Sequence, residues 1–316
     1  MLPEADVALG VGSGSHAWQT AQVMLRFEPV LLESRPDLVL VVGDVNSTLA
    51  CALTCAKLGI AVGHVEAGLR SFDRTMPEEY NRLLTDQVAE VLFTPSRDAD
   101  DNLRREGVPE ERIHFVGNVM IDTLVRFLPQ ALPRWQGLQA KYNVSARQRY
   151  VLATLYRPAN VGDPAILREI VSALGELSRT LPVIFPVHPR TRQRLVDMRL
   201  QPETWQVQLT EPLGYVDFLA LQKHARLVLT DSGGVQEETT YLGVPCLTLR
   251  PTTERPVTLT QGTNRLVASK REALLQAAHA VLNADCSMGD TPLPPLWDGR
   301  EAERIVQILR SWAEDR

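Results

Sequence analysis

Short apolar runs alternate with amphipathic stretches along most of this sequence, and this alternation constrains the fold more than any other feature. The runs have the length of a strand and are rich in Val, Ile and Leu, and the stretches between them have the length of helices. Continuous apolar strands that alternate with helices indicate parallel sheets covered by helices on both faces. The expected strands lie in LVLVVG from Leu38, AVGHVEA from Ala61, VLFTPS from Val91, YVLATL from Tyr150, VIFPVH from Val183, LVLTDS from Leu227 and PCLTL from Pro245.

The length of the chain favours two domains. A chain of 316 residues is long for a single hydrophobic core. The composition changes between Phe127 and Arg149, where prolines and then polar residues precede a new strand. We therefore expect two Rossmann-like domains, over residues 1–125 and 126–300. The final stretch, 301–316, has helical periodicity, and we expect a helix that can pack back on the first domain.

Charge and apolar content exclude several classes of partner. The 33 basic and 38 acidic residues give a net charge of −5, and no basic run could track a nucleic-acid backbone. No apolar stretch is long enough to span a bilayer, and the start, MLPEADVALG, does not resemble a secretory signal. We therefore expect a cytoplasmic protein that binds neither nucleic acid nor membrane. Four scattered cysteines, Cys51, Cys55, Cys246 and Cys286, predict buried thiols rather than a disulfide scaffold or a zinc site.

Polar motifs follow several of the expected strands. Open parallel sheets bind ligands at the carboxyl ends of their strands, where loops and helix N-termini present free N–H groups. VVGDVNST, HVEAGLRSFDRTMPEE, PVHPRTR and LTDSGGVQEE all lie at such ends. Because both expected domains carry such loops, the sequence predicts a ligand-binding cleft between two facing domains.

The segment TDSGGVQEE is the most informative motif of the second half. Ser232, Gly233 and Gly234 lie between an apolar strand and a helix, where their N–H groups and the Ser232 hydroxyl could surround a phosphate. Glu237 and Glu238 are expected in the first turn of that helix, within reach of ribose hydroxyls. The alternative is a simple turn whose acidic residues favour the helix dipole.

Other residues of the second half have two interpretations each. Phe218 and Tyr215 could stack on a planar base, or could pack in the core. His188 in PVHPRTR and Arg255 in TTERPVT could meet the charge of a diphosphate, or could belong to solvated helix starts.

The first half concentrates carboxylates at strand ends. Asp44 and Glu66 each end a strand, and Glu78 opens a helix behind Pro77. We expect these acids to converge on one site, with Arg70 and Arg82 close enough to keep them ionised or to bind anion oxygens. Taken singly, Asp44 could be a helix cap and Glu78 a helix-dipole charge.

Together these segments resemble a known family. GDVNST, HVEAGLRSFDRTMPEEYNR, PVHPRTR, LTDSGGVQEETTYLGVPCLTLR, TTERPVT and GTNRLV are similar, in order and spacing, to the motif series of the non-hydrolysing UDP-N-acetylglucosamine 2-epimerases. The resemblance covers nearly the whole chain. It implies a GT-B-like fold of two Rossmann-type domains, with the nucleotide held mainly by the second.

The resemblance also implies a mechanism and residue roles. UDP would leave by anti elimination to give 2-acetamidoglucal, and would then return while a proton reaches the opposite face of carbon 2. Asp44, Glu66 and Glu78 are then the acid–base candidates, supported by Arg82, and which of them is the base stays open. The remaining roles implied are phosphate and ribose binding by Ser232, Gly233, Gly234 and Glu238, and uracil binding by Phe218.

The expected partner is UDP-N-acetylglucosamine or UDP, bound by a homodimer. The family needs no nicotinamide cofactor, and no metal-ligand spacing occurs in the sequence. A UDP-sugar glycosyltransferase of GT-B type is one alternative, although simple glycosyl transfer does not need several first-domain acids. A UDP-sugar-binding protein that has lost catalysis is another, and relatives that hydrolyse the substrate are a third.

The sequence departs from the family pattern at two places. The family's opening strand and its Gly-Thr-Arg-Pro-Glu loop do not occur, so we expect the first domain to lack an opening β-α unit, of about 30 residues. The nearby GVGSGSHAWQ is expected to be a flexible turn before a helix. In ATLYRPANVGDP, Tyr156 and Ala159 stand where the family has a histidine and an acid or serine, whereas Arg157 and Asn160 remain. With a reference pKa of about 10, tyrosine is a neutral acid and supplies no positive charge.

Overall fold

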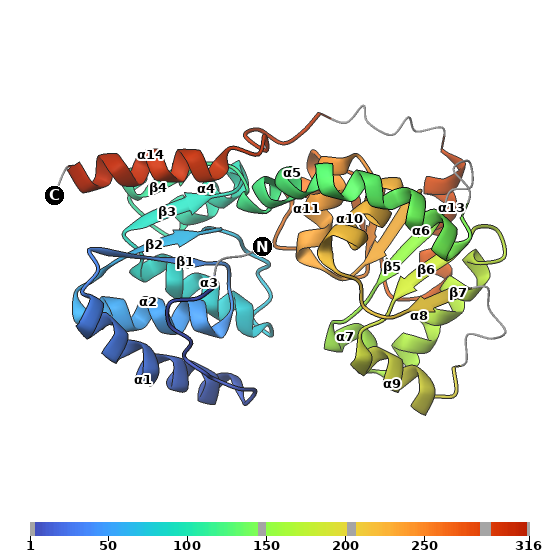
Figure 1. Cartoon of the computed structure of the whole chain (residues 1–316), viewed down its shortest axis with the longest axis horizontal. Coiled ribbons are helices and arrows are strands. Elements are labelled where there is room, and N and C mark those ends of the chain that lie inside the picture. The colour runs from blue at the N-terminus through green and yellow to red at the C-terminus, as the bar shows by residue number, and fades with distance from the viewer. Residues whose placement is uncertain (1–3, 145–149, 201–206, 285–291, 315–316) are drawn as a thin grey trace. The chain divides into compact units, whose positions relative to one another are not determined.

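The computed structural model describes residues 4–144, 150–200, 207–284 and 292–314. The chain divides into two compact units, which are Met1–Asn118 with Glu301–Arg316, and Val119–Arg300. Each unit contains a parallel sheet with helices (Figure 1), so the predicted α/β class is confirmed. No helix in the described part of the chain is long and apolar enough to cross a membrane.

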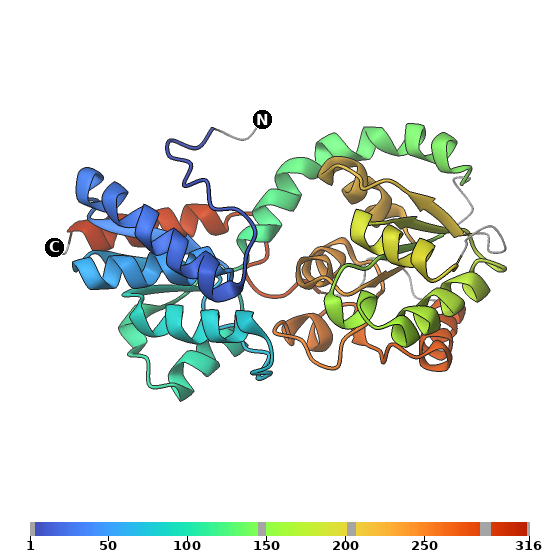
Figure 2. The same ribbon diagram turned by 90° about the horizontal axis from the view of Figure 1, so that it is seen from below.

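The first unit has a four-stranded parallel sheet in the order β1-β2-β3-β4. Helices α1 and α2 cover one face of this sheet, and α14 runs along the other (Figures 1 and 2). In α14, Arg304 Nη1 donates a hydrogen bond to the Val116 carbonyl at 2.9 Å. The elements of this unit are α1 (His16–Ser34), β1 (Leu38–Val42), α2 (Asn46–Leu58), β2 (Ala61–Val65), α3 (Pro77–Val88), β3 (Val91–Thr94), α4 (Arg97–Arg105), the 3₁₀ turn η1 (Glu110–Arg112), β4 (Ile113–Phe115) and α14 (Glu301–Glu314).

The second unit has a six-stranded sheet in the order β10-β9-β8-β5-β6-β7, and every neighbouring pair is parallel. Its elements are α5 (Val119–Ala131), the 3₁₀ turn η2 (Leu132–Arg134), α6 (Trp135–Tyr142), β5 (Val151–Thr154), α7 (Pro158–Val161), α8 (Pro164–Leu177), β6 (Val183–Pro186), α9 (Pro189–Asp197), β7 (Val207–Thr210), α10 (Tyr215–His224), β8 (Leu227–Thr230), α11 (Gly233–Leu242), β9 (Cys246–Thr248), α12 (Val257–Thr260), β10 (Asn264–Leu266) and α13 (Arg271–Asn283).

Two apolar cores cover the two faces of this second sheet. One core includes Leu167 of α8 and Leu274 of α13, and the other includes Leu124 of α5 and Leu219 of α10. Figure 1 shows α5 and α10 on the opposite side of the strands from α8. Because β5, β6, β8 and β9 contribute side chains to both cores, these four strands are largely apolar, as the sequence pattern predicted.

The order in which strands are added to the second sheet reverses between β5 and β8, which are themselves parallel. From β5 the order continues through β6 to β7, whereas β8 leads in the other direction to β9 and β10. In open parallel sheets such a switch point leaves a crevice outside the carboxyl ends of the two central strands. The loops after Thr154 and Thr230 therefore occupy the position where this fold binds ligands.

The unit boundary differs from the expected one. The expected division at residues 125 and 126 falls inside α5, all of which belongs to the second unit. The proline-rich and polar stretch after Phe127 forms the end of α5 and then α6, because Ala131, Leu138 and Tyr142 are buried in a core of the second unit. Their burial keeps this stretch from acting as a linker.

The expected strands were all found, but three short ones were not anticipated. These are β4, β7 and β10. Each contains only three or four residues with polar side chains among them, such as His114 in β4 and Asn264 in β10. Runs this short carry too little periodicity to be recognised in a sequence.

Candidate active site and nucleotide-binding loops

Arg82, on α3, joins two carboxylates of the first unit. Its Nη2 and Nε atoms donate to Oδ2 of Asp44 at 2.6 and 3.0 Å, and its Nη1 donates to Glu79 Oε2 at 2.6 Å. The guanidinium is buried, whereas the Asp44 side chain is 30% exposed. Arg82 therefore fixes the loop after β1 to helix α3 and leaves part of the Asp44 carboxylate accessible.

Glu79 anchors the loop that leads into α3. It accepts hydrogen bonds from the Ser71 amide at 3.0 Å, the Ser71 hydroxyl at 2.9 Å and the Phe72 amide at 2.9 Å. Burial opposes ionisation, but these hydrogen bonds and the charge of Arg82 hold the pKa of Glu79 below its ordinary value. Glu79 is thus an ionised structural carboxylate, which separates its role from that of its neighbour Glu78.

Glu66 follows β2 and lies over the turn that precedes Asp44. Its Oε2 atom is 3.3 Å from the position that a Cβ atom would take at Gly43. Gly43 has φ +70° and Glu66 has φ +74°. Glycine takes this left-handed conformation without strain and leaves room for the nearby carboxylate of Glu66.

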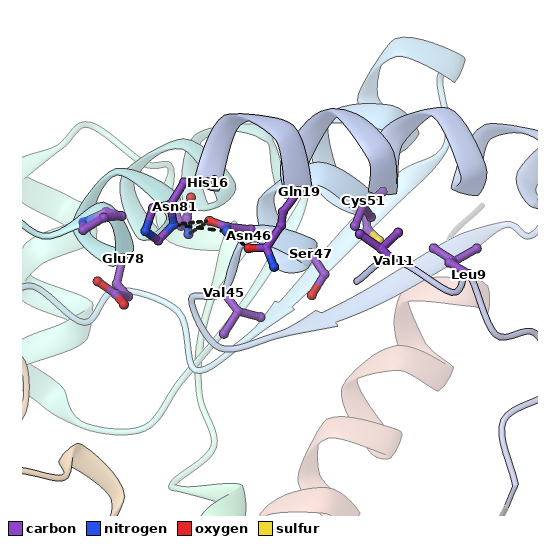
Figure 3. A pocket seen from close by; sticks show the side chains of 12 residues that line it. Leu9, Val11, His16, Gln19, Val45, Asn46, Ser47, Cys51, Glu78 and Asn81 are labelled. Atoms are coloured by element: carbon purple, nitrogen blue, oxygen red, sulfur yellow. Dashed lines mark hydrogen bonds between the residues drawn. The ribbon is translucent and has the colours of Figure 1, made fainter. Parts of the chain in front are cut away.

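Glu78 lines a cavity of about 490 Å³ in the first unit (Figure 3). It stands in the first turn of α3, where the helix begins with Pro77 and where acidic side chains favour the helix dipole. Its carboxylate has no hydrogen-bond partner among the described residues. Asn81, one turn further along, also lines the cavity and donates to the Asp44 carbonyl at 2.8 Å.

The same cavity contains polar residues that the sequence analysis did not assign. Asn46 contacts His16 Nδ1 at 3.1 Å and donates to Gln19 Oε1 at 2.9 Å. Figure 3 shows this group beside Asn81, with Val11 and Leu9 at the other end of the cavity. The helix expected after this glycine-rich segment is present, since α1 begins at His16 with Ser15 as its N-cap. The glycine-rich signal GSGSH could have indicated that this turn borders a site.

Arg70 does not contact the predicted acid–base residues. It pairs instead with Asp86 at 2.7 Å and with Glu106 at 2.6 Å, and it is fully buried. Arg82 contacts Asp44, whereas the expectation that Arg70 lies close to the acid–base candidates is wrong, because two other carboxylates of the unit accept from its guanidinium. His64 completes this buried group through a 2.6 Å contact with Asp86.

Asp231 joins the two strand ends at the switch point of the second unit. Its carboxylate accepts from the amides of Tyr156 at 3.2 Å and Arg157 at 3.0 Å, and from Asn160 Nδ2 at 3.1 Å. Burial raises the pKa of Asp231 above its ordinary value, although these hydrogen bonds favour the ionised form. Asp231 stands in the motif TDSGGVQEE, whose sequence pattern assigned it no role.

Ser232 and Gly233 start α11 directly after β8. The Ser232 hydroxyl accepts from the Val235 amide at 3.5 Å and caps the helix. A Cβ atom at Gly233 would lie 2.7 Å from Glu254 Oε1, so glycine is required for this close approach. Gly234 follows in the same first turn, where helix N–H groups remain unpaired within the helix.

Glu237 and Glu238 are not in the first turn of this helix, contrary to expectation. Because α11 begins at Gly233, both lie in its second turn, and both are buried. Glu237 contacts Arg255 at 3.1 Å, and Glu238 accepts from the Tyr215 hydroxyl at 3.0 Å. Burial raises the pKa of Glu238, against the hydrogen bond from Tyr215.

The other predicted ligand-binding residues of the second unit differ in how exposed they are. Phe218 is half-buried against the core that contains Leu219, while His188 is exposed at the end of β6. The Tyr156 side chain is 48% exposed, and its backbone amide is the group that contacts Asp231. Arg157 is half-buried, and its Nε atom has no hydrogen-bond partner in the described part of the chain.

The cysteines are free thiols in the described residues. Cys55 and Cys246 are buried and Cys51 is half-buried, and burial raises the pKa of each thiol to about 11. Cys286 lies outside the described residues. Over those residues, no group of three or more His, Cys, Asp or Glu side chains has an arrangement that could hold a metal ion.

Known 2-epimerases of UDP-sugars are similar to this chain in sequence. The family model described as UDP-N-acetylglucosamine 2-epimerase matches residues 1–310. A UDP-N-acetylglucosamine 2-epimerase of Methanocaldococcus jannaschii is 44% identical over 314 residues, which are 98% of this chain and 84% of the relative. A UDP-2,3-diacetamido-2,3-dideoxy-D-glucuronate 2-epimerase of Pseudomonas aeruginosa is 41% identical over 284 residues, 89% of this chain and 77% of the relative.

A solved structure of such an epimerase has a similar fold. The crystal structure of the Methanocaldococcus jannaschii UDP-GlcNAc 2-epimerase in complex with UDP-GlcNAc and UDP matches with a TM-score of 0.87 and 43% identity. The match covers 98% of this chain and 85% of that one. The GT-B-like fold expected from the sequence is therefore confirmed, and the chain belongs to the UDP-N-acetylglucosamine 2-epimerase family.

Proposed function

We propose that the protein catalyses the reversible epimerisation of UDP-N-acetylglucosamine at carbon 2, giving UDP-N-acetylmannosamine. The observation that carries the proposal is that Asp44, Glu66 and Glu78 belong to one unit. Asp44 pairs with Arg82 of α3, Glu66 lies beside the glycine that precedes Asp44, and Glu78 is in the first turn of α3. Inversion of a carbon centre requires proton carriers on both faces of the sugar, and several carboxylates in one site meet that need. Family membership supports the same reaction.

The proposed chemistry is an elimination followed by re-addition. A carboxylate takes the proton from carbon 2 while the bond from carbon 1 to the UDP oxygen breaks, and the bonding pair leaves with UDP. The electrons of the former C–H bond form the double bond of 2-acetamidoglucal. UDP then re-forms its bond to carbon 1 while a second acid protonates carbon 2 from the opposite face. Either Asp44, Glu66 or Glu78 can be the base, and Arg82 orients Asp44.

We propose that the second unit holds the nucleotide at its switch point. Ser232, Gly233 and Gly234 present a helix N-terminus there, which favours phosphate. Arg157 Nε, which has no partner among the described residues, is suited to an anionic oxygen. The other proposed ligand groups are Tyr156, His188 and Arg255 for the diphosphate, Glu238 for the ribose and Phe218 for uracil.

A second candidate is the same carbon-2 chemistry on a different UDP-sugar. The Pseudomonas aeruginosa relative, which is 41% identical, acts by name on UDP-2,3-diacetamido-2,3-dideoxy-D-glucuronate. The deciding experiment is incubation with each UDP-sugar in deuterium oxide, read by NMR. Deuterium at carbon 2 of UDP-N-acetylglucosamine together with a UDP-N-acetylmannosamine product is the expected result.

Other results of that experiment would favour the rival functions. Binding of UDP-sugar without deuterium uptake would identify a binding protein that has lost catalysis. Sugar transfer to an acceptor without carbon-2 exchange would identify a glycosyltransferase, and release of free N-acetylmannosamine a hydrolysing relative. Light scattering of the same preparation tests the expected homodimer.

A further inference from the structure

His64 is a fully buried histidine whose two ring nitrogens both face hydrogen-bond acceptors. It lies on β2, with Nδ1 2.6 Å from Asp86 Oδ1 and Nε2 2.9 Å from the Gly43 carbonyl oxygen. A carbonyl oxygen can only accept, and an ionised carboxylate can only accept. Both ring nitrogens must therefore donate, which makes His64 an imidazolium.

The charges around His64 agree with this protonation state. Asp86 also accepts from Arg70 Nη2 at 2.7 Å and from the Gly68 amide at 3.1 Å, and Arg70 pairs with Glu106. An imidazolium gives this buried group two positive and two negative charges, whereas a neutral ring would leave one carboxylate uncompensated. Burial lowers the pKa of His64, but the charge and hydrogen bond of Asp86, the hydrogen bond to the Gly43 carbonyl and the charge of Glu66 outweigh it and raise the pKa.

The Gly43 carbonyl connects this buried group to the proposed active site. Gly43 donates its amide to the Val65 carbonyl at 3.0 Å and accepts from His64 through its own carbonyl. That carbonyl belongs to the peptide that joins Gly43 to Asp44. Glu66 Oε2 lies 3.3 Å from the position that a Cβ atom would take at the same glycine. The orientation of this one peptide thus affects two of the proposed acid–base residues.

We propose that His64 is a positioning residue, which as an imidazolium between Asp86 and the Gly43 carbonyl fixes the Gly43–Asp44 turn for catalysis. The inference rests on the proposed function, because Asp44 and Glu66 are its acid–base groups. The alternative is that His64 only stabilises the packing of α3 on β2, through its contact with Asp86. The two roles use different nitrogens of the ring and can be separated.

Two substitutions each keep one of the two hydrogen bonds. In His64→Asn the side-chain amide nitrogen falls near the former Nδ1 and can still donate to Asp86. In His64→Gln the amide nitrogen falls near the former Nε2 and can still donate to the Gly43 carbonyl. His279→Gln, at an exposed position of α13, is the matched control.

The experiment measures kcat, KM and Tm for the wild type and the three variants, with carbon-2 deuterium exchange as the assay. We expect His64→Asn to lower kcat by about 10–100-fold, as a displacement of roughly 1 Å in a catalytic group does, with little change in KM. We expect His64→Gln to keep kcat within about threefold of the wild type, yet to have the lower Tm of the two, because it removes the hydrogen bond to Asp86 that His64→Asn retains. His279→Gln should match the wild type.

A positioning role predicts that His64→Asn has the lower kcat and His64→Gln the lower Tm. Equal losses of kcat in both variants, or losses that follow Tm, would show that His64 only stabilises the fold and would overturn the proposal. Failure of the proposed function is a separate outcome, since the wild type itself would then show no carbon-2 exchange.

Discussion

Arg82 donates two hydrogen bonds to the same Asp44 oxygen, at 2.6 and 3.0 Å, from a helix that begins close to Glu78. The Asp44 carboxylate is thereby held at a fixed angle, with its other oxygen left for further contacts. A guanidinium makes this two-point contact and a lysine ammonium does not.

The first prediction concerns Arg82→Lys. One amine cannot span Asp44 and Glu79 with the geometry of the guanidinium, so we expect kcat for carbon-2 exchange to fall by about 30-fold, equivalent to roughly 2 kcal/mol for a lost charge-assisted hydrogen bond. UDP affinity, measured by calorimetry, should stay within about threefold. The exposed Arg105→Lys is the control. Unchanged kcat in Arg82→Lys would contradict the orienting role.

A second prediction concerns Glu78→Gln. Because Glu78 makes no hydrogen bond among the described residues, the isosteric amide should lower Tm only slightly, through the lost charge at the helix N-terminus. Loss of a general acid or base typically lowers the rate by about 10²–10⁴-fold, and we expect deuterium exchange at carbon 2 to fall by that factor. Exchange at the wild-type rate would remove Glu78 from the mechanism, whereas Glu111→Gln, on an exposed turn, should exchange normally.

The third prediction concerns Asp231→Asn. The carboxylate accepts from two amides and from Asn160, but an asparagine has only one acceptor oxygen, so its NH₂ group must face another donor. The loop after β5 and the loop after β8 should then move apart. We expect UDP affinity to weaken by about tenfold, which corresponds to roughly 1.4 kcal/mol, and Tm to fall. Affinity and Tm equal to those of the wild type would show that the bridge is dispensable.

The fourth prediction concerns Tyr156→His. The substitution changes an exposed ring and leaves the backbone amide that contacts Asp231. An imidazole can be partly protonated near neutral pH, where a phenol cannot carry positive charge. We expect the rate of epimerisation to rise or to stay the same. A collapse of activity with unchanged UDP binding would mean that the phenol has its own role, and Tyr156→Phe would then be equally inactive.

The fifth prediction is a pH dependence of stability that arises from Glu79. Its pKa is lower in the folded protein than the reference value of about 4.3, so its ionised form stabilises the fold above that pH. The contribution is lost as the pH falls through the folded pKa. The Tm difference between the wild type and Glu79→Gln should therefore be largest near pH 7 and should shrink below about pH 4. A difference that stays constant down to pH 3 would contradict this assignment.

Much of the fold followed from local pattern. The apolar runs at Ala61 and Leu227 became strands whose side chains are buried on both faces of a sheet, and the run at Leu38 became a strand although Leu40 and Val42 stay exposed. The Ser232–Gly234 turn became a helix start because serine caps and glycine permits close approach. The motif series also identified the family correctly.

The site depended on contacts that no local pattern contains. Asp231 accepts a hydrogen bond from the Arg157 amide, which is 74 residues away in the sequence. His64 contacts Asp86, which is 22 residues away. Likewise, Arg70 was assigned to the wrong carboxylates, because distance along the chain does not reveal which acid a buried guanidinium reaches.

The sequence by itself thus determined the α/β class, the principal strands and the segments that carry the polar residues, since these depend on periodicity within a few neighbouring positions. Only the tertiary structure decided the partners of Arg70, Glu237 and Glu238 and the protonation of His64. A buried ionisable group must be paired by whatever lies beside it in space, and the packing of parallel strands and helices brings together residues from distant parts of the chain.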